Sequence, residues 1–123
     1  MPTLNLREKT GTALSGQVTR QSASVKSRHE ITGKVARRFL IRGAVQGVGY
    51  RFFAQRAAAR HQVVGYVRNL ADGSVEALVE GPANSVESFK HDLATGPQWA
   101  AVEQVEEISL EPSDIYSSFR IEH

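Results

Sequence analysis

Residues 43–53, GAVQGVGYRFF, have the composition of an anion-binding turn. Glycines at 43, 47 and 49 follow the apolar run Phe39-Leu40-Ile41, and Tyr50-Arg51 open a helix-like segment. Glycine permits the positive φ angles that aim several backbone amides at one centre, and amides at a helix start attract anions. The Arg51 guanidinium adds a permanent charge and a planar set of donors suited to phosphate oxygens. We interpret the stretch as a phosphate cradle; the alternative is an ordinary strand-to-helix turn with a solvated arginine.

The cradle is neither of two common nucleotide-binding loops. No Gly-Lys-Ser/Thr follows, as a P-loop requires, and Gly47-Val48-Gly49 lacks the third glycine of a dinucleotide fingerprint. Further motifs lie downstream in a definite order: VGYVRN at 64–69, DGSVE at 72–76, Gly96-Pro97 with Val102, and Phe119-Arg120-Ile121. Together with GAVQGVGYRFF they resemble the signature of the acylphosphatases, over roughly residues 35–123.

This resemblance implies an enzyme that hydrolyses the carboxyl-phosphate bond of small acyl phosphates to a carboxylate and inorganic phosphate. Arg51 would bind the phosphate and Asn69 would position the attacking water. Backbone donors would come from the cradle, namely Gln46, Gly47, Val48, Gly49, Tyr50 and Arg51. We expect direct attack by water without a metal ion or a cofactor, and we expect inorganic phosphate or sulfate to compete with the substrate.

The residue types are compatible with this chemistry. The chain has no cysteine, and we find no catalytic histidine pair, carboxylate cluster or metal motif in the sequence. A carboxyl phosphate makes these unnecessary, because its leaving group is a carboxylate with a conjugate-acid pKa of roughly 4 to 5 and departs without a general acid. An asparagine side chain can accept from water and donate to phosphate. The alternative role of Asn69 is to cap the Asp-Gly turn that follows it.

The elements that must position these residues follow from hydrophobic periodicity. Strands are predicted from Val35 to Gly43, at 63–69 and at 74–80, with an Asp-Gly turn between the last two. One helix is predicted over 51–61, and a second begins at an Asn84/Glu87 capping box and stops at Gly96-Pro97. Strands at 105–110 and 118–121 complete the chain, and Trp99 and Val102 are predicted to pack under the preceding connection.

The element order β-α-β-β-α-β with a short extra C-terminal strand predicts an α+β, ferredoxin-like fold with two helices on one face of a mixed sheet. Its first crossover makes the first two strands parallel, with the third strand between them. Their C-terminal ends then lie at one edge of the sheet, about 10 Å apart. Arg51 and Asn69 would therefore meet in one pocket. Gln62 stands where the family often has a glycine, which predicts a strained helix end.

Charge separates the first 34 residues from the rest. They carry six of the fifteen Lys and Arg but only two of the thirteen Asp and Glu, which leaves residues 35–123 slightly acidic. We predict that residues 1–34 form a basic, disordered extension and that residues 35–123 form the acylphosphatase-like domain; a targeting segment is the alternative for the extension. The absence of cysteine and of any apolar run near 20 residues suits a cytoplasmic protein without a membrane span.

Two other functional classes are alternatives for this sequence. One is a non-catalytic domain that binds phosphate or another anion for regulation, although a pure binder would not require Asn69. The other is an RNA-binding module, because ferredoxin-like sheets can present aromatic side chains to bases. The predicted strands lack clustered aromatics, so we expect a small-molecule partner, no nucleic acid, no membrane and a monomer.

Overall fold

The structure is a computed structural model that describes residues 33–123. The predicted N-terminal extension lies almost wholly outside the described residues. The chain runs through β1 (Lys34–Ala44), α2 (Tyr50–His61), β2 (Val64–Asn69), β3 (Val75–Pro82), α3 (Ala83–Thr95), β4 (Ala101–Leu110) and β5 (Phe119–Glu122). Neither helix is long and apolar enough to cross a membrane, a statement that covers residues 33–123.

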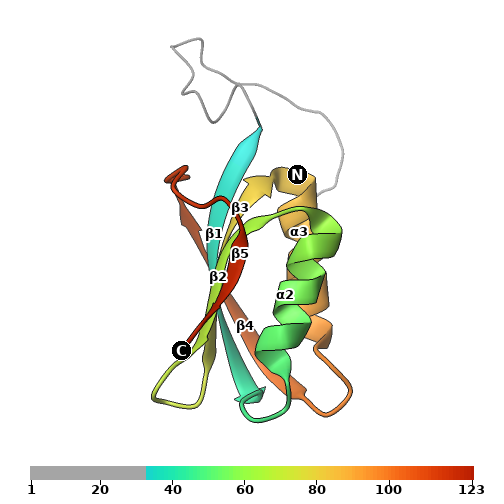
Figure 1. The fold of residues 1–123 in the computed structure, drawn as a ribbon. Helices are drawn as coiled ribbons and strands as arrows, with labels where there is room; N and C mark the ends of the chain where they lie inside the picture. Colours follow the sequence, from blue (N-terminus) through green and yellow to red (C-terminus); the bar gives the residue numbers. More distant parts are fainter. Residues whose placement is uncertain (1–32) are drawn as a thin grey trace, which may run out of the picture.

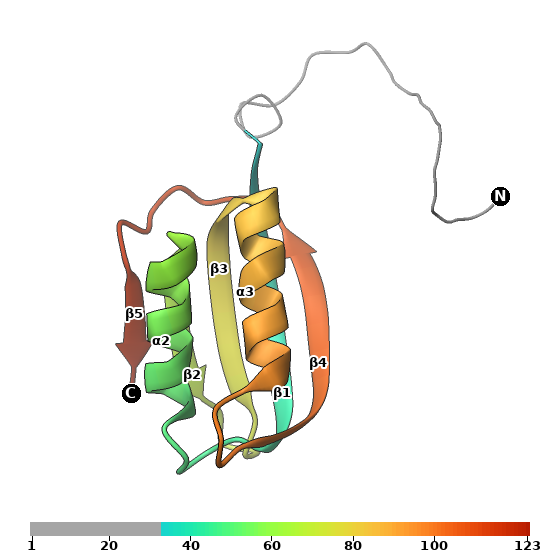
Figure 2. The ribbon, with the colours of Figure 1, turned by 90° about the vertical axis from the view of Figure 1, so that its right-hand side faces the viewer.

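The sheet has the order β4-β1-β3-β2-β5. β1 and β2 both pair antiparallel with β3 and therefore run parallel to each other, while β5 pairs parallel with β2 (Figure 1). Both helices cover the same face of the sheet (Figure 2). The predicted α+β, ferredoxin-like fold with a short C-terminal strand is thus confirmed, and β1 and β2 end at a common edge.

The core lies between the helices and the sheet. β3 contributes every second side chain to it, and these residues have no exposed surface, as expected when one face of a strand is buried. The α2 face is built from small residues and one aromatic, which lets the helix lie close to the sheet. Fully or nearly fully buried are Phe39, Ile41, Tyr50, Ala54, Ala57, Ala58, Val67, Val75, Ala77, Val79, Phe89 and Leu93.

On the other face of the sheet, a buried carboxylate is paired with two partly exposed arginines. Glu76 on β3 is 2% exposed and accepts hydrogen bonds from Arg38 Nε at 2.5 Å and Arg68 Nε at 2.6 Å. Burial opposes ionisation of this carboxyl, but the two arginines outweigh it and hold the pKa of Glu76 below its ordinary value. These two ion pairs therefore tie β1, β3 and β2 together.

Strand β1 is longer than predicted. It continues past Gly43 to Ala44, where it pairs with the start of β4, and β4 begins at Ala101 rather than at 105. A register shift between Arg42 and Gly43 marks an irregularity that allows the pairing to continue. At Gly43 the backbones approach so closely that an added Cβ would lie 2.1 Å from the Ala101 carbonyl oxygen.

Two further local predictions are wrong. Trp99 is 77% exposed instead of packed under the α3–β4 connection, whereas Val102 packs against the core as predicted. The capping box does not form either. Pro82 is the residue before α3, and the Asn84 carboxamide oxygen accepts from the amide of Ser85 inside the first turn. Pro82 has a non-helical ψ of 145° and α3 begins at Ala83, so Asn84 lies inside the first turn and is not the N-cap residue.

Candidate active site

The cradle joins the end of β1 to the start of α2. Gly47 and Gly49 have φ angles of 77° and 76°, in the left-handed region that favours glycine. An added Cβ at either position would meet no described atom within 4 Å, so conformation and not crowding requires glycine there. Gly49 precedes the first turn of α2, and this turn contains no acidic residue. The amides at the helix start therefore leave a positive end that favours an anion.

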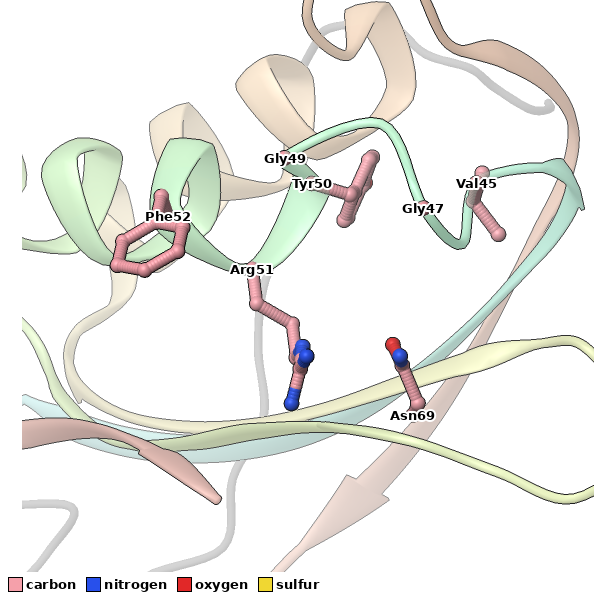
Figure 3. A pocket seen from close by; sticks show the side chains of 7 residues that line it. All are labelled: Val45, Gly47, Gly49, Tyr50, Arg51, Phe52 and Asn69. Atoms are coloured by element: carbon pink, nitrogen blue, oxygen red, sulfur yellow. The ribbon is translucent and has the colours of Figure 1, made fainter. Parts of the chain in front are cut away.

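A pocket of about 130 Å³ lies beside the cradle. It is lined by Val45, Gly47, Gly49, Tyr50, Arg51, Phe52 and Asn69. Arg51 extends from the start of α2 and Asn69 from the end of β2, and their side chains point into the same space below the loop (Figure 3). The volume holds a phosphoryl group together with water. Residues 18 positions apart in the chain therefore meet as the fold topology predicted.

The C-terminal strand holds Arg51 in place. Arg51 Nη1 donates to the carbonyl oxygen of Glu122 at 3.1 Å and lies 3.4 Å from Nδ1 of His123. Because β5 runs parallel to β2, its end reaches the same edge of the sheet as Asn69. The Glu122 carbonyl accepts from one guanidinium nitrogen, which leaves the other donors of Arg51 available to a ligand.

Asn69 is the last residue of β2 and pairs with Val75 across the ladder. The following turn is closed by the Leu70 amide, which donates to the Ser74 carbonyl at 2.9 Å. Asp72 also stabilises it by accepting from the amide and the hydroxyl of Ser74, and these bonds hold the pKa of the Asp72 carboxyl below its ordinary value. Among the described residues, the side chains that hydrogen-bond to this turn are those of Asp72 and Gln46, and not that of Asn69.

Other members of the predicted set are placed differently. Gly47, Gly49 and Tyr50 line the pocket, whereas Gln46 and Val48 do not. The hydroxyl of Tyr50 is turned into the core, where it donates to the Leu93 carbonyl at 2.6 Å, and burial raises the pKa of this phenol. Any contribution of Tyr50 to anion binding must therefore come from its backbone.

Sequence reasoning missed four residues of this site. Val45 and Phe52 line the pocket, and Phe52 is 62% exposed at its rim. Phe52 could have been noticed because it lies next to Arg51 but off the apolar stripe of α2. The contacts of Glu122 and His123 with Arg51 have no local sequence signal, because they depend on where β5 joins the sheet.

Comparison with known proteins agrees with this geometry. A family model described as acylphosphatase matches residues 37–121. The chain belongs to the acylphosphatase family. An acylphosphatase of Solibacter usitatus is 44% identical over 95 residues, which cover 77% of this chain and 98% of the relative.

Solved structures give the same result. The crystal structure of acylphosphatase from Bacillus subtilis matches with a TM-score of 0.70 and 32% identity, covering 72% of this chain and 99% of that one. For an acylphosphatase from Coxiella burnetii the TM-score is 0.71 with 32% identity and coverage of 75% and 96%. The predictions of an acylphosphatase fold and of an enzyme acting on small acyl phosphates are confirmed. Nothing in these comparisons favours the non-catalytic alternative.

Proposed function

We propose that this acylphosphatase binds the phosphoryl group of its substrate with Arg51 and the cradle amides, while the Asn69 carboxamide holds the attacking water. One observation carries the proposal: Arg51 and Asn69, from different elements, line a single pocket at the positive end of α2. Arg51 and the amides complement the charge on the equatorial phosphoryl oxygens. The Asn69 oxygen can accept a hydrogen bond from water, and its nitrogen can donate one to phosphate.

The reaction that fits these groups is an in-line displacement at phosphorus. Water attacks the phosphorus atom from the side of Asn69, the bond between phosphorus and the bridging oxygen breaks, and the carboxylate leaves with the bonding electron pair. The attacking water loses its protons to the phosphate product and to solvent. Because the leaving carboxylate is a weak base, Arg51 and the amides need only stabilise charge, and alkyl phosphates should be poor substrates.

Mutagenesis of the two side chains tests their roles. Arg51→Ala should lower kcat/KM by about 10²–10³-fold, the usual effect of removing a main charge-stabilising donor, and should weaken inhibition by inorganic phosphate. Asn69→Ala should lower kcat by about 10²-fold through loss of water positioning with a smaller change in KM. The assay is phosphate release from acetyl or benzoyl phosphate without added metal.

Two exposed residues outside the pocket serve as matched controls. Arg56→Ala removes an arginine from the same helix, and Asn84→Ala removes an asparagine from α3; both should keep kcat/KM within about two-fold. Wild-type turnover by Asn69→Ala would refute the role of Asn69. Equal losses in Arg51→Ala and Arg56→Ala would show that net charge and not the pocket matters.

The predicted domain division can be tested with the same activity assay. We propose that residues 35–123 contain the whole active site, since Arg51, Asn69 and Glu122 all lie within them. A chain without residues 1–34 should keep wild-type kcat and KM; a loss of turnover would contradict this. Competition by inorganic phosphate and sulfate should raise KM only. The monomeric state and the cytoplasmic location stay predictions, and sedimentation of the purified chain tests the first.

A further inference from the structure

The side chain of Gln46 connects the cradle with the turn that follows Asn69. Its Nε2 atom donates to the carbonyl oxygens of Leu70 and Ser74, both at 2.8 Å. A side-chain amide nitrogen has two protons, and here each has an acceptor. The Gln46 side chain is therefore committed to the turn and does not line the pocket.

The two acceptors are the ends of the turn. Leu70 directly follows Asn69, and the Leu70 amide in turn donates to the Ser74 carbonyl. The Gln46 side chain thus binds both ends of the turn from the cradle. One of its acceptors, Leu70, is the residue next to the proposed water-positioning side chain. Gly47, the residue after Gln46, lines the pocket. No other side chain of the described residues makes hydrogen bonds linking cradle and turn.

We propose that Gln46 is a positioning residue that fixes the distance between the phosphate-binding cradle and Asn69. The inference rests on the proposed roles of Arg51 and Asn69. The phosphoryl group would be held from the cradle side and the water from the β2 side, so the line of attack depends on how these two sides are joined. A displacement of about 1 Å can cost up to 10²-fold in rate.

Gln46→Leu tests this because it keeps the approximate size of the side chain and removes both donors. The fold should survive the change. The Leu70 carbonyl still accepts from the Gly73 amide at 3.2 Å, and the Ser74 carbonyl still accepts from the Leu70 amide. We expect kcat to fall about 10–100-fold, while KM and the inhibition constant of inorganic phosphate change less than about three-fold because Arg51 and the amides remain.

A double-mutant cycle with Asn69→Ala separates positioning from general damage. If Gln46 acts through Asn69, Gln46→Leu should change kcat less than about two-fold once Asn69 is alanine. Full additivity of the two losses would overturn the inference. The matched control is Gln55→Leu, since Gln55 Nε2 also donates to a backbone carbonyl on another element, that of Phe119 at 3.4 Å, but does not line the pocket. It should leave kcat within about two-fold.

A measurement without turnover keeps this inference distinct from the proposed function. In amide NMR spectra, Gln46→Leu should shift the side-chain signal of Asn69, whereas Gln55→Leu should not. Inorganic phosphate should still shift the amides of Gly47 and Gly49 in the Gln46→Leu protein. An inactive wild-type enzyme would refute the proposed function alone. An unchanged Asn69 signal in Gln46→Leu would overturn the role of Gln46, whether or not the enzyme turns over.

Discussion

Gln62 is held in a left-handed conformation at the end of α2, and glycine at this position should stabilise the fold. Its φ and ψ angles are 57° and 45°, and its amide donates to the carbonyls of Ala58 and Ala59, which closes the helix. The sequence predicted this strain from the absence of a glycine, and the observed φ angle confirms it. The side chain of Gln62 is exposed, so its removal sacrifices little packing.

The expected gain is a difference between two opposing effects. A side chain in the left-handed region costs about 1–2 kcal/mol, and this cost disappears in Gln62→Gly. Glycine also makes the unfolded chain more flexible, and the larger loss of backbone entropy on folding reduces this gain by about 0.5–1 kcal/mol. The net stabilisation is therefore about 0.5–1 kcal/mol, which corresponds to a rise in Tm of about 2–8 °C for a domain of this size.

Thermal unfolding followed by circular dichroism measures this rise. The control is Gln62→Ala, which removes the same side chain but keeps the Cβ atom responsible for the strain. Alanine should leave Tm nearly unchanged, and both variants should keep wild-type turnover, since Gln62 lies about 16 Å along the helix from Arg51. Equal Tm values for the glycine and alanine variants would refute the argument that backbone strain limits stability here.

Two more predictions concern the sheet. Gly65→Ala should lower the free energy of unfolding by about 3 kcal/mol or more, because the φ of Gly65 is 139° and the new Cβ would lie 1.8 Å from a carbonyl oxygen of β3. The control Gly73→Ala should cost much less, since Gly73 has a φ of 93° and an added Cβ there has no neighbour within 4 Å. Equal urea midpoints for the two variants would contradict this prediction. Glu76→Gln should cost about 2 kcal/mol at pH 7 through its charged hydrogen bonds to Arg38 and Arg68. The pKa of Glu76 is lowered in the folded state, so this contribution is present above the ordinary pKa of the carboxyl and is lost as pH falls through the folded value. In urea unfolding, the difference in free energy of unfolding between Glu76→Gln and wild type should therefore shrink in acid. A difference that does not change with pH would refute the assignment.

Several features of the protein could be predicted from the sequence because they depend on residues close together in the chain. The Asp-Gly turn, the helix over 51–61 and the glycines at 47 and 49 reflect local backbone preferences, and the structure has them at or within one residue of the predicted positions. The meeting of Arg51 and Asn69 was also predictable, because a helical crossover makes β1 and β2 parallel, and parallel strands have their C-terminal ends on the same side of the sheet.

Other features depended on contacts between segments far apart in sequence. Trp99 was predicted to be buried from its apolar character, but the short connection to β4 leaves its side chain outside the core. The extension of β1 to Ala44 required the irregular pairing with β4. A strand pattern gives no information about the register of its partner, so this extension could not be predicted from the residues alone.

The sequence by itself determined the order of the elements, the chemical character of the cradle and the two side chains that meet in the pocket, since residue type and spacing govern local conformation. Only the tertiary structure decided how these groups are held. Gln46 reaches the turn after Asn69, and Glu122 reaches Arg51, through hydrogen bonds between residues 24 to 71 positions apart. Such contacts follow from how the folded chain brings its segments together, and no short stretch of sequence encodes them.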